Sequence, residues 1–275
     1  MNYNELIRDI KDSPKTRTIF YPFGNYKFNK FSREYLASEY PAMVRKFYNC
    51  HEGERCFIAG NGPSLTAEDL DMIKGEYSFG TNKIYNIFPN TQWRPTYYIC
   101  MDYMSMKEEI MSEKTKIEAE YLFLNWQQHK NIEKDEKIVL CNFNPHYVIN
   151  LWNDTHVDFS EDCSKYIYNA RTVTYSAIQF AAYMGFKEIY LMGVDANYPF
   201  YKDGKGRKHK TEAKDSHFKN GGYNRIDYMV KETNEIGYKL AKEYCNSHGI
   251  RIANATRGGK LEIFERVQLE KLFNN

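Results

Sequence analysis

Residues 55–64 read RCFIAGNGPS, and this stretch decides the fold. Its first half, Arg55 to Ala59, is a short apolar run of the kind that forms a buried β-strand. Its second half, Gly60 to Ser64, combines two glycines with a proline and predicts a tight turn. The apolar residues between Leu65 and Ile73 then suggest a helix. The stretch therefore predicts a strand, a glycine turn and the start of a helix.

Further apolar runs after this unit predict more strands, at residues 77–81, 96–101, 121–124, 137–141, 187–195 and 250–253. Helical or turn-rich stretches separate most of them. Strands that alternate with helices form a largely parallel sheet. We therefore expect an α/β, Rossmann-like fold, with a mostly parallel sheet and helices on both faces.

Three segments of the second half predict helices. Residues 174–184 are apolar on most sides and stop at Gly185, a common helix terminator, so we expect a buried helix there. Apolar residues recur every three or four positions from Arg225 to Ser247, which predicts a long amphipathic helix. Residues 267–273 predict a last short helix.

One domain with an appendage is the expected organisation for 275 residues. Residues 1–54 are predicted to be a helical N-terminal extension packed on a nucleotide-binding catalytic domain at 55–275. Between Lys202 and Lys219, seven basic residues stand against three acidic ones, with little apolar content. We expect a lid at about 196–224, although a solvated charge run is the alternative.

The bulk composition excludes several classes of protein. A hydrophobic fraction of 42%, a charged fraction of 27% and a formal net charge of +2 are those of a globular protein without a general attraction to nucleic acid. No apolar run approaches the roughly 18 residues of a membrane span, and the N-terminus does not read as a signal peptide. Six cysteines form no CxxC pair, so we expect reduced core thiols and a cytoplasmic protein.

The glycine turn is the first candidate binding site, through Gly60, Asn61, Gly62 and Ser64. Glycines let a backbone approach a ligand closely, and the following helix would offer free N–H groups to a phosphate. The turn matches neither the Walker loop nor the GxGxxG dinucleotide motif. A structural turn without a ligand is the alternative reading.

Polar side chains also follow other predicted strands. Asn82 and Asp102 come after the second and third strands, and Asp195 ends the strand at 187–195. Open α/β sheets bind ligands at this edge, although Asn and Asp are also common turn formers. His217, in the basic segment, could act as a general base or be a surface histidine. The other histidines form no metal-binding set, so no metal is expected.

Four blocks of sequence resemble the bacterial and archaeal DUF115 family, also called 6-hydroxymethylpterin diphosphokinase MptE-like proteins. They are CFIAGNGPSL at 56–65, TVTY at 172–175, MGFKEIYLMGVD at 184–195 and NATRGGKLE at 254–262. The resemblance covers about residues 50–270.

The same blocks resemble, more distantly, the bacterial sialyltransferases of glycosyltransferase family 42. That resemblance implies that Asn61, Ser64 and Asn82 bind a nucleotide and that Tyr198 lies near its phosphate. It places Thr256 in a loop facing the nucleotide and makes His217 the base candidate. The segment after Asp195 is one residue longer than in that family. In addition, Asp102 replaces an Asn, and the lid has one nearby histidine instead of two.

The resemblances imply three functions. The first is a glycosyltransferase for bacterial surface glycans, with a nucleotide-sugar donor such as a CMP-linked nonulosonic acid and a glycan acceptor. In it, His217 would act as base and Tyr198 would steady the leaving phosphate, with Tyr198 and Asp195 as the next candidates for the base. Asn61, Asn82 and Asp102 would hold the nucleotide, without a cofactor. A lipid-linked acceptor would bring the protein to a membrane surface, and a homo-oligomer is compatible with the sequence. The second is diphosphate transfer from ATP to a hydroxymethylpterin, with Mg²⁺ on Asp102 and Asp195. The third is a non-catalytic nucleotide-binding module.

Overall fold

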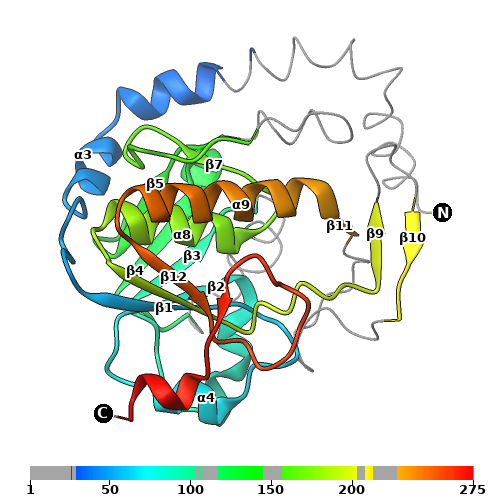
Figure 1. Cartoon of the computed structure of the whole chain (residues 1–275). Helices are drawn as coiled ribbons and strands as arrows, with labels where there is room; N and C mark the ends of the chain where they lie inside the picture. The colour runs from blue at the N-terminus through cyan, green and yellow to red at the C-terminus, as the bar shows by residue number, and fades with distance from the viewer. Residues whose placement is uncertain are drawn as a thin grey trace.

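The computed structural model describes residues 26, 29–102, 106, 117–144, 157–202, 208–212 and 228–274. Eight parallel strands form its main sheet, in the order β13-β12-β8-β1-β2-β3-β4-β5 (Figure 1). The bounds of these strands are β1 Arg55–Ala59, β2 Ser78–Thr81, β3 Tyr97–Cys100, β4 Tyr121–Asn125, β5 Ile138–Cys141, β8 Glu188–Met192, β12 Arg251–Asn254 and β13 Glu265–Arg266. The parallel Rossmann-like sheet predicted from the sequence is confirmed.

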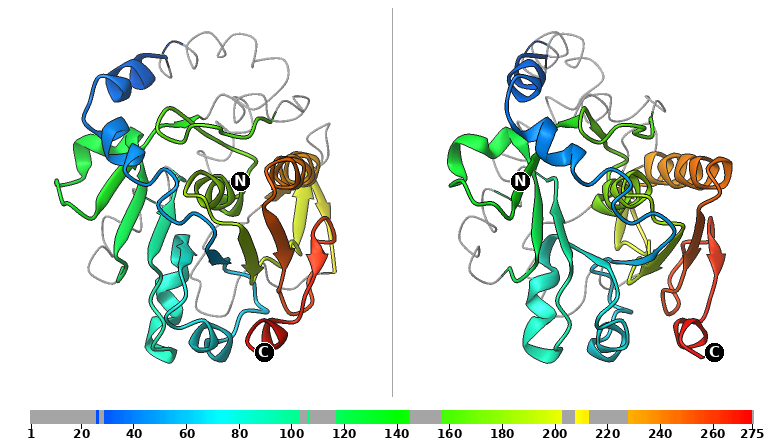
Figure 2. Two further views of the ribbon diagram at one scale, coloured as in Figure 1. Left: turned by 60° about the vertical axis from the view of Figure 1, so that its left-hand side comes forward. Right: turned by 90° about the vertical axis from the view of Figure 1, so that its left-hand side faces the viewer.

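Both faces of the sheet are buried, because alternate residues of each strand enter opposite cores. In β1, Cys56 and Ile58 belong to one core and Phe57 and Ala59 to the other. Figure 2 shows α8 (Val173–Tyr183) and α9 (Lys231–Ser247) on one face of the sheet and α4 (Ala67–Met72) and η5 (Leu269–Leu272) on the other. The first core lies between the sheet and α8 and α9, and the second lies on the opposite face. The helical elements are α3 Tyr40–Arg45, α4 Ala67–Met72, η1 Asn82–Asn90, η4 Trp126–Asn131, α8 Val173–Tyr183, α9 Lys231–Ser247 and η5 Leu269–Leu272.

The strand order changes direction at β1, and this position matters for function. From β1 the chain adds β2, β3, β4 and β5 on one side, and later adds β8, β12 and β13 on the other. Ile58 of β1 is in register with Phe79 of β2 and Leu191 of β8, so these three strands end at the same level. Parallel α/β sheets bind ligands outside the carboxyl ends of strands at such a switch point.

The buried helix predicted at 174–184 is confirmed as α8, one residue earlier in the chain. Thr172 caps it by accepting a hydrogen bond from the backbone N–H of Thr174. Gly185 follows with a φ of +92°, a conformation that favours glycine. Because α8 returns the chain to the start of β8, its N-terminus lies toward the carboxyl edge of the sheet.

Three predicted elements have different bounds. The strand at 187–195 ends at Met192, because Gly193 adopts a φ of +59° and turns the chain. The predicted helix at 225–247 begins at Lys231, because residues 228–230 form β11 and pair with β9. The predicted final helix is the 3₁₀ turn η5 preceded by β13.

The predicted lid contains strands in its described parts. β9 (Phe200–Lys202) pairs antiparallel with β10 (Lys208–Lys210) and parallel with β11 (Tyr228–Val230). Two further short strands, β6 (Phe143–Asn144) and β7 (Ile167–Tyr168), form a separate pair. These strands are too short for an alternation signal in the sequence, and tertiary pairing defines them.

Residues 29–54 pack against the β4–β5 side of the sheet. Ser32 and Asn142 exchange hydrogen bonds of 3.2 and 3.3 Å. Phe47 contacts Phe123 of β4 edge-on, with ring centroids 5.1 Å apart. Residues 1–25 of the predicted extension lie outside the described residues.

All six cysteines are free thiols, as expected, and five of them are buried. Burial raises the pKa of Cys56 and Cys141 well above the ordinary value for a thiol. Cys50 is the exception to the expectation of core thiols, because it is exposed.

Candidate functional site

The candidate site is the carboxyl edge of β8, β1, β2 and β3. Asn61 follows β1, Asn82 follows β2, Asp102 follows β3 and Asp195 follows β8. Thr256 follows β12, one strand further along. The fold therefore brings residues from distant parts of the sequence to one edge, at the switch point of the sheet.

The glycine turn packs tightly against the turn after β8. The backbone N–H groups of Gly60 and Gly62 donate to the carbonyls of Met192 and Gly193, each at 2.8 Å. A Cβ on Gly60 would lie 2.5 Å from the Gly193 oxygen. We expected these glycines to leave room for a ligand. Within the described structure they leave room for the turn after β8.

The helix after this turn offers little to a phosphate, in contrast to the sequence expectation. α4 has only six residues, and the Thr66 side chain already accepts a hydrogen bond from the Asp69 N–H. Glu68 and Asp69 lie in its first turn, and acidic groups there complement the helix dipole themselves. Arg257 forms an ion pair with Asp69 at 2.7 Å.

The Asp195 side chain holds the glycine turn in place through a hydrogen bond with Ser64. Its side chain is buried, and its Oδ2 accepts a hydrogen bond of 2.8 Å from the Ser64 hydroxyl. A Cβ on Gly62 would overlap the same carboxylate oxygen. Burial raises the pKa of Asp195, while the Ser64 hydrogen bond and nearby Arg266 act in the opposite direction. Asp195 thus contacts the turn itself, with Ser64 as its partner.

The orientation of the Asn61 side chain is determined by its neighbours. Its Nδ2 donates to the backbone oxygen of Thr81 at 2.8 Å and to the Thr81 hydroxyl at 3.2 Å. That hydroxyl in turn donates to the Ala59 carbonyl at 2.9 Å. A flipped amide would place its oxygen against the Thr81 carbonyl, so the amide oxygen must point away from β2.

Two buried amide oxygens at this edge have no hydrogen-bond donor among the described residues. They are Oδ1 of Asn61 and Oδ1 of Asn82. Asn82 holds a φ of +46°, and its carbonyl accepts a hydrogen bond of 2.5 Å from the Tyr98 hydroxyl. Buried polar atoms without partners are uncommon in proteins and call for an explanation such as an absent ligand.

The other predicted site residues have different surroundings. Asp102 is exposed at the end of β3. Tyr198 lies on the path from Asp195 to β9, and its carbonyl accepts a hydrogen bond of 2.5 Å from the Thr211 hydroxyl. Thr256 lines an open pocket of about 490 Å³ beside the site, between residues 255–258 and 266–270. His217 lies outside the described residues.

Two general features of the described residues bear on this site. They contain no cluster of three or more His, Cys, Asp or Glu side chains arranged to hold a metal ion. Among their helices, none combines the length and apolar character needed to cross a membrane.

Comparison with known proteins defines the family. A sequence model described as "6-hydroxymethylpterin diphosphokinase MptE-like" matches residues 29–200. The chain belongs to this MptE-like family. Comparison with curated proteins found no significant match.

Solved structures with similar chain traces include two transferases. The MAf glycosyltransferase from Magnetospirillum magneticum AMB-1 is 14% identical with a TM-score of 0.46, over 84% of this chain and 38% of that one. The chain thus spans less than half the length of the Magnetospirillum protein. The sialyltransferase CstII from Campylobacter jejuni, solved with cytidine-5'-monophosphate, is 16% identical with a TM-score of 0.42, over 78% of this chain and 85% of that one.

The sequence did not reveal the residues that support this site. Gly193 and Gly259 have positive φ and pack against Leu65 and Asp195. Arg266 holds the loop after β12. Gly193 could have been found as the glycine that interrupts an apolar strand, whereas Arg266 is one of many arginines.

Proposed function

We propose that this MptE-like protein is a glycosyltransferase that binds a nucleotide-activated sugar at the carboxyl edge of β8, β1 and β2. The observation that carries the proposal is the pair of buried amide oxygens of Asn61 and Asn82, for which the described part of the chain supplies no donor. Because amide oxygens accept hydrogen bonds, they match the hydroxyls of ribose or a sugar, or the amino group of a base. They do not match phosphate oxygens, which are acceptors themselves.

The sequence resemblance to family 42 supports a CMP-linked donor, such as a CMP-linked nonulosonic acid, and a glycan acceptor. In this proposal Asn61 and Asn82 hold the nucleoside, and Tyr198 lies near the departing phosphate. Asp195 holds the glycine turn in place through Ser64. The acceptor hydroxyl attacks the anomeric carbon, the bond to the nucleotide phosphate breaks, and a base removes the hydroxyl proton.

His217 is our candidate for this base. We expect His217→Ala to lower turnover by about 100-fold or more, because general-base catalysis typically contributes that much. Nucleotide affinity should change little, since the base contacts the acceptor and not the donor. Steady-state kinetics and calorimetric titration measure the two quantities separately. Unchanged turnover with an unchanged pH profile would make His217 a surface residue.

The family description favours a second candidate, diphosphate transfer from ATP. It would need Mg²⁺, for which Asp102 and Asp195 are the sequence candidates. Strand spacing of about 4.8 Å separates the ends of β3 and β8 by roughly 14 Å, since three spacings lie between them. One Mg²⁺ binds its ligands at about 2.1 Å, so this separation is too large for the two carboxylates to share an ion unless a loop moves. The geometry thus supports the first candidate better.

A thermal-shift panel of CMP, CDP, UDP, GDP, ADP and ATP, with and without Mg²⁺, distinguishes the candidates. A ligand at 100 times its dissociation constant stabilises the fold by about 2.7 kcal/mol. We expect CMP to stabilise the protein without metal. Asn61→Asp should abolish the shift, because a carboxylate oxygen in place of Nδ2 would repel the Thr81 carbonyl and turn the acceptor away from the ligand. Asn90→Asp, the same change at an exposed position, should keep it. Stabilisation by ATP only with Mg²⁺ would favour the diphosphokinase, and no stabilisation by any nucleotide would refute the proposal.

A further inference from the structure

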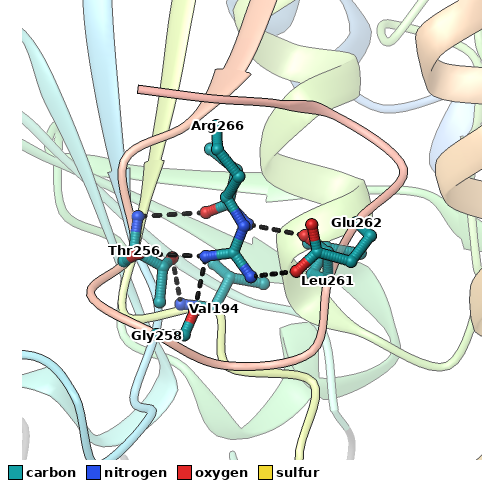
Figure 3. Close-up of polar contacts among 7 residues, drawn as sticks. Val194, Thr256, Gly258, Leu261, Glu262 and Arg266 are labelled. Carbon is teal, nitrogen blue, oxygen red and sulfur yellow. Dashed lines mark hydrogen bonds and ion pairs between the residues drawn. The ribbon is translucent and has the colours of Figure 1, made fainter. Parts of the chain in front are cut away.

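Arg266 holds together the loop that follows β12. This loop, residues 255–262, curls back beside β13, and the Arg266 guanidinium lies in its concave side (Figure 3). It donates to the carbonyls of Thr256, at 3.1 Å, and of Gly258. It also pairs with the Glu262 carboxylate at 2.7 Å. One planar side chain therefore ties three points of the loop.

This loop also packs tightly against residues 193–195, the segment that carries Asp195. The Thr256 hydroxyl accepts a hydrogen bond of 3.0 Å from the Val194 N–H. The Lys260 N–H donates to the Asp195 carbonyl at 2.7 Å. Gly259 has no room for a side chain, because its Cβ would lie 2.8 Å from the Asp195 Cα and carbonyl oxygen. The loop after β12 therefore holds the backbone of Asp195 in place through hydrogen bonds and close packing.

On the opposite side, the Asp195 carboxylate contacts the glycine turn. It accepts a hydrogen bond from Ser64 Oγ and lies where a side chain on residue 62 would otherwise be. Contacts therefore run without interruption from Arg266 through Thr256 and Lys260 to Asp195 and on to the glycine turn. Arg266 itself lies at the end of β13, and two strands, β12 and β8, separate β13 from β1.

We propose that Arg266 is a positioning residue, which sets the place of the glycine turn by holding the β12 loop against Val194 and Asp195. The carbonyl contacts perform this task, and the pairing with Glu262 does not. The Glu262 side chain is 70% exposed, and exposed ion pairs contribute little. Both carbonyl contacts come from one guanidinium nitrogen, Nη1, whose two N–H bonds lie at fixed directions in the plane of the group, a geometry that the freely rotating ammonium of lysine does not impose.

The first test measures the ligand-free protein by amide hydrogen exchange of Arg266→Ala, Arg266→Lys and Glu262→Gln. In Arg266→Ala we expect exchange at the Val194 and Lys260 amides to rise about tenfold or more, as loss of charged hydrogen bonds implies. The Ile58 amide within β1 should change only with global stability. Arg266→Lys should give an intermediate result and Glu262→Gln the wild-type result. Wild-type protection of both amides in folded Arg266→Ala would overturn the proposal.

The second test rests on the proposed function and measures nucleotide affinity by calorimetry. We expect Arg266→Ala to weaken binding about tenfold. Millimolar ethylguanidinium should restore affinity, whereas ethylammonium should not. Restored affinity would show that Arg266 acts by positioning the loop. If Arg266→Ala bound weakly only because the fold was less stable, added ethylguanidinium would not restore binding. Equal affinity of wild type and Arg266→Ala would contradict the proposal. Failure of the wild type to bind any nucleotide would refute the proposed function alone, since the exchange test does not need a ligand.

Discussion

Residue 62 must be glycine because Asp195 leaves no space for a side chain there, and not because the backbone needs glycine's flexibility. A Cβ at this position would overlap the Asp195 carboxylate, which is itself held by Ser64. The two turns can therefore approach closely only when residue 62 has no side chain. Asp195 and the turn after β1 must move together in any variant that enlarges this position.

Gly62→Ala should destabilise the fold by about 1–3 kcal/mol, the usual cost of overpacking, and displace the glycine turn. Nucleotide affinity should fall with it. Ser64→Ala is the matched control, because it removes the hydrogen bond to Asp195 without adding volume. Urea denaturation measures the stability difference. A Gly62→Ala variant with wild-type stability would show that the two turns separate freely.

Asp195 makes the stability of the protein depend on pH. Burial raises its pKa, so the folded state binds the proton more tightly than the unfolded chain does. Stability must then fall as the pH rises from the ordinary carboxyl pKa through the raised one, and be regained on acidification. Asp195→Asn lacks this proton. We expect wild type to gain stability relative to Asp195→Asn as the pH is lowered from 7 toward 4, as measured by denaturant unfolding. A constant difference would contradict this expectation.

At the scale of elements, α9 carries a buried polar atom that its packing does not explain. Asn234 lies in the first turns of the helix with 5% of its surface exposed, and its Oδ1 has no donor among the described residues. One turn further, the Tyr238 hydroxyl lies 3.4 Å from Thr172 Oγ1 at the start of α8. Asn234 therefore lies on the side of α9 that faces α8, near the carboxyl edge of the sheet.

Replacing Asn234 with Leu should raise the free energy of unfolding by about 1 kcal/mol, because it removes an unpaired buried acceptor. Asn246→Leu, an exposed position on the same helix, measures the gain in helix propensity alone. The difference between the two variants in thermal denaturation isolates the effect of the unpaired oxygen. A loss of stability in Asn234→Leu alone would show that a buried partner, such as a water molecule, satisfies this oxygen.

At the scale of the whole molecule, residues 29–54 contribute side chains to the core of the sheet. Phe47 packs edge-on against Tyr97, Tyr121 and Phe123, with ring centroids 5.0 to 6.1 Å apart. These partners come from β3 and β4, near the middle of the chain. An aromatic residue before the first strand thus helps to form the core above the later strands.

Phe47→Ala should cost about 3–5 kcal/mol of stability, as expected for a buried aromatic side chain. Tyr48→Ala, at an adjacent position that is 59% exposed, should cost far less. If the segment is part of one unit, circular dichroism and tyrosine fluorescence will report a single coincident transition in both variants. Separate transitions for the two signals would make residues 29–54 an independent unit.

The sequence by itself determined the local parts of this fold. The runs of β1, β4 and β5 and the helix α8 were predicted within one or two residues, because burial on both faces leaves a continuous apolar pattern. The polar residues after the strands were also identified from the sequence. Each apolar run marks where a strand ends, and a parallel sheet places the residues that follow its strands at one edge. β9, β10 and β11 were missed because short strands carry no such pattern.

Only the tertiary structure decided which strands are neighbours and what each polar group contacts. Ser64 and Asp195 are 131 positions apart, and they meet because β8 lies beside β1. The same pairing places Gly62 against Asp195 and engages the backbone N–H groups of Gly60 and Gly62 with the turn after β8. The lack of a donor for the Asn61 and Asn82 side-chain oxygens also becomes visible only once the described residues are placed in three dimensions. Strand order and hydrogen-bond partners depend on long-range packing, and local composition carries no record of them.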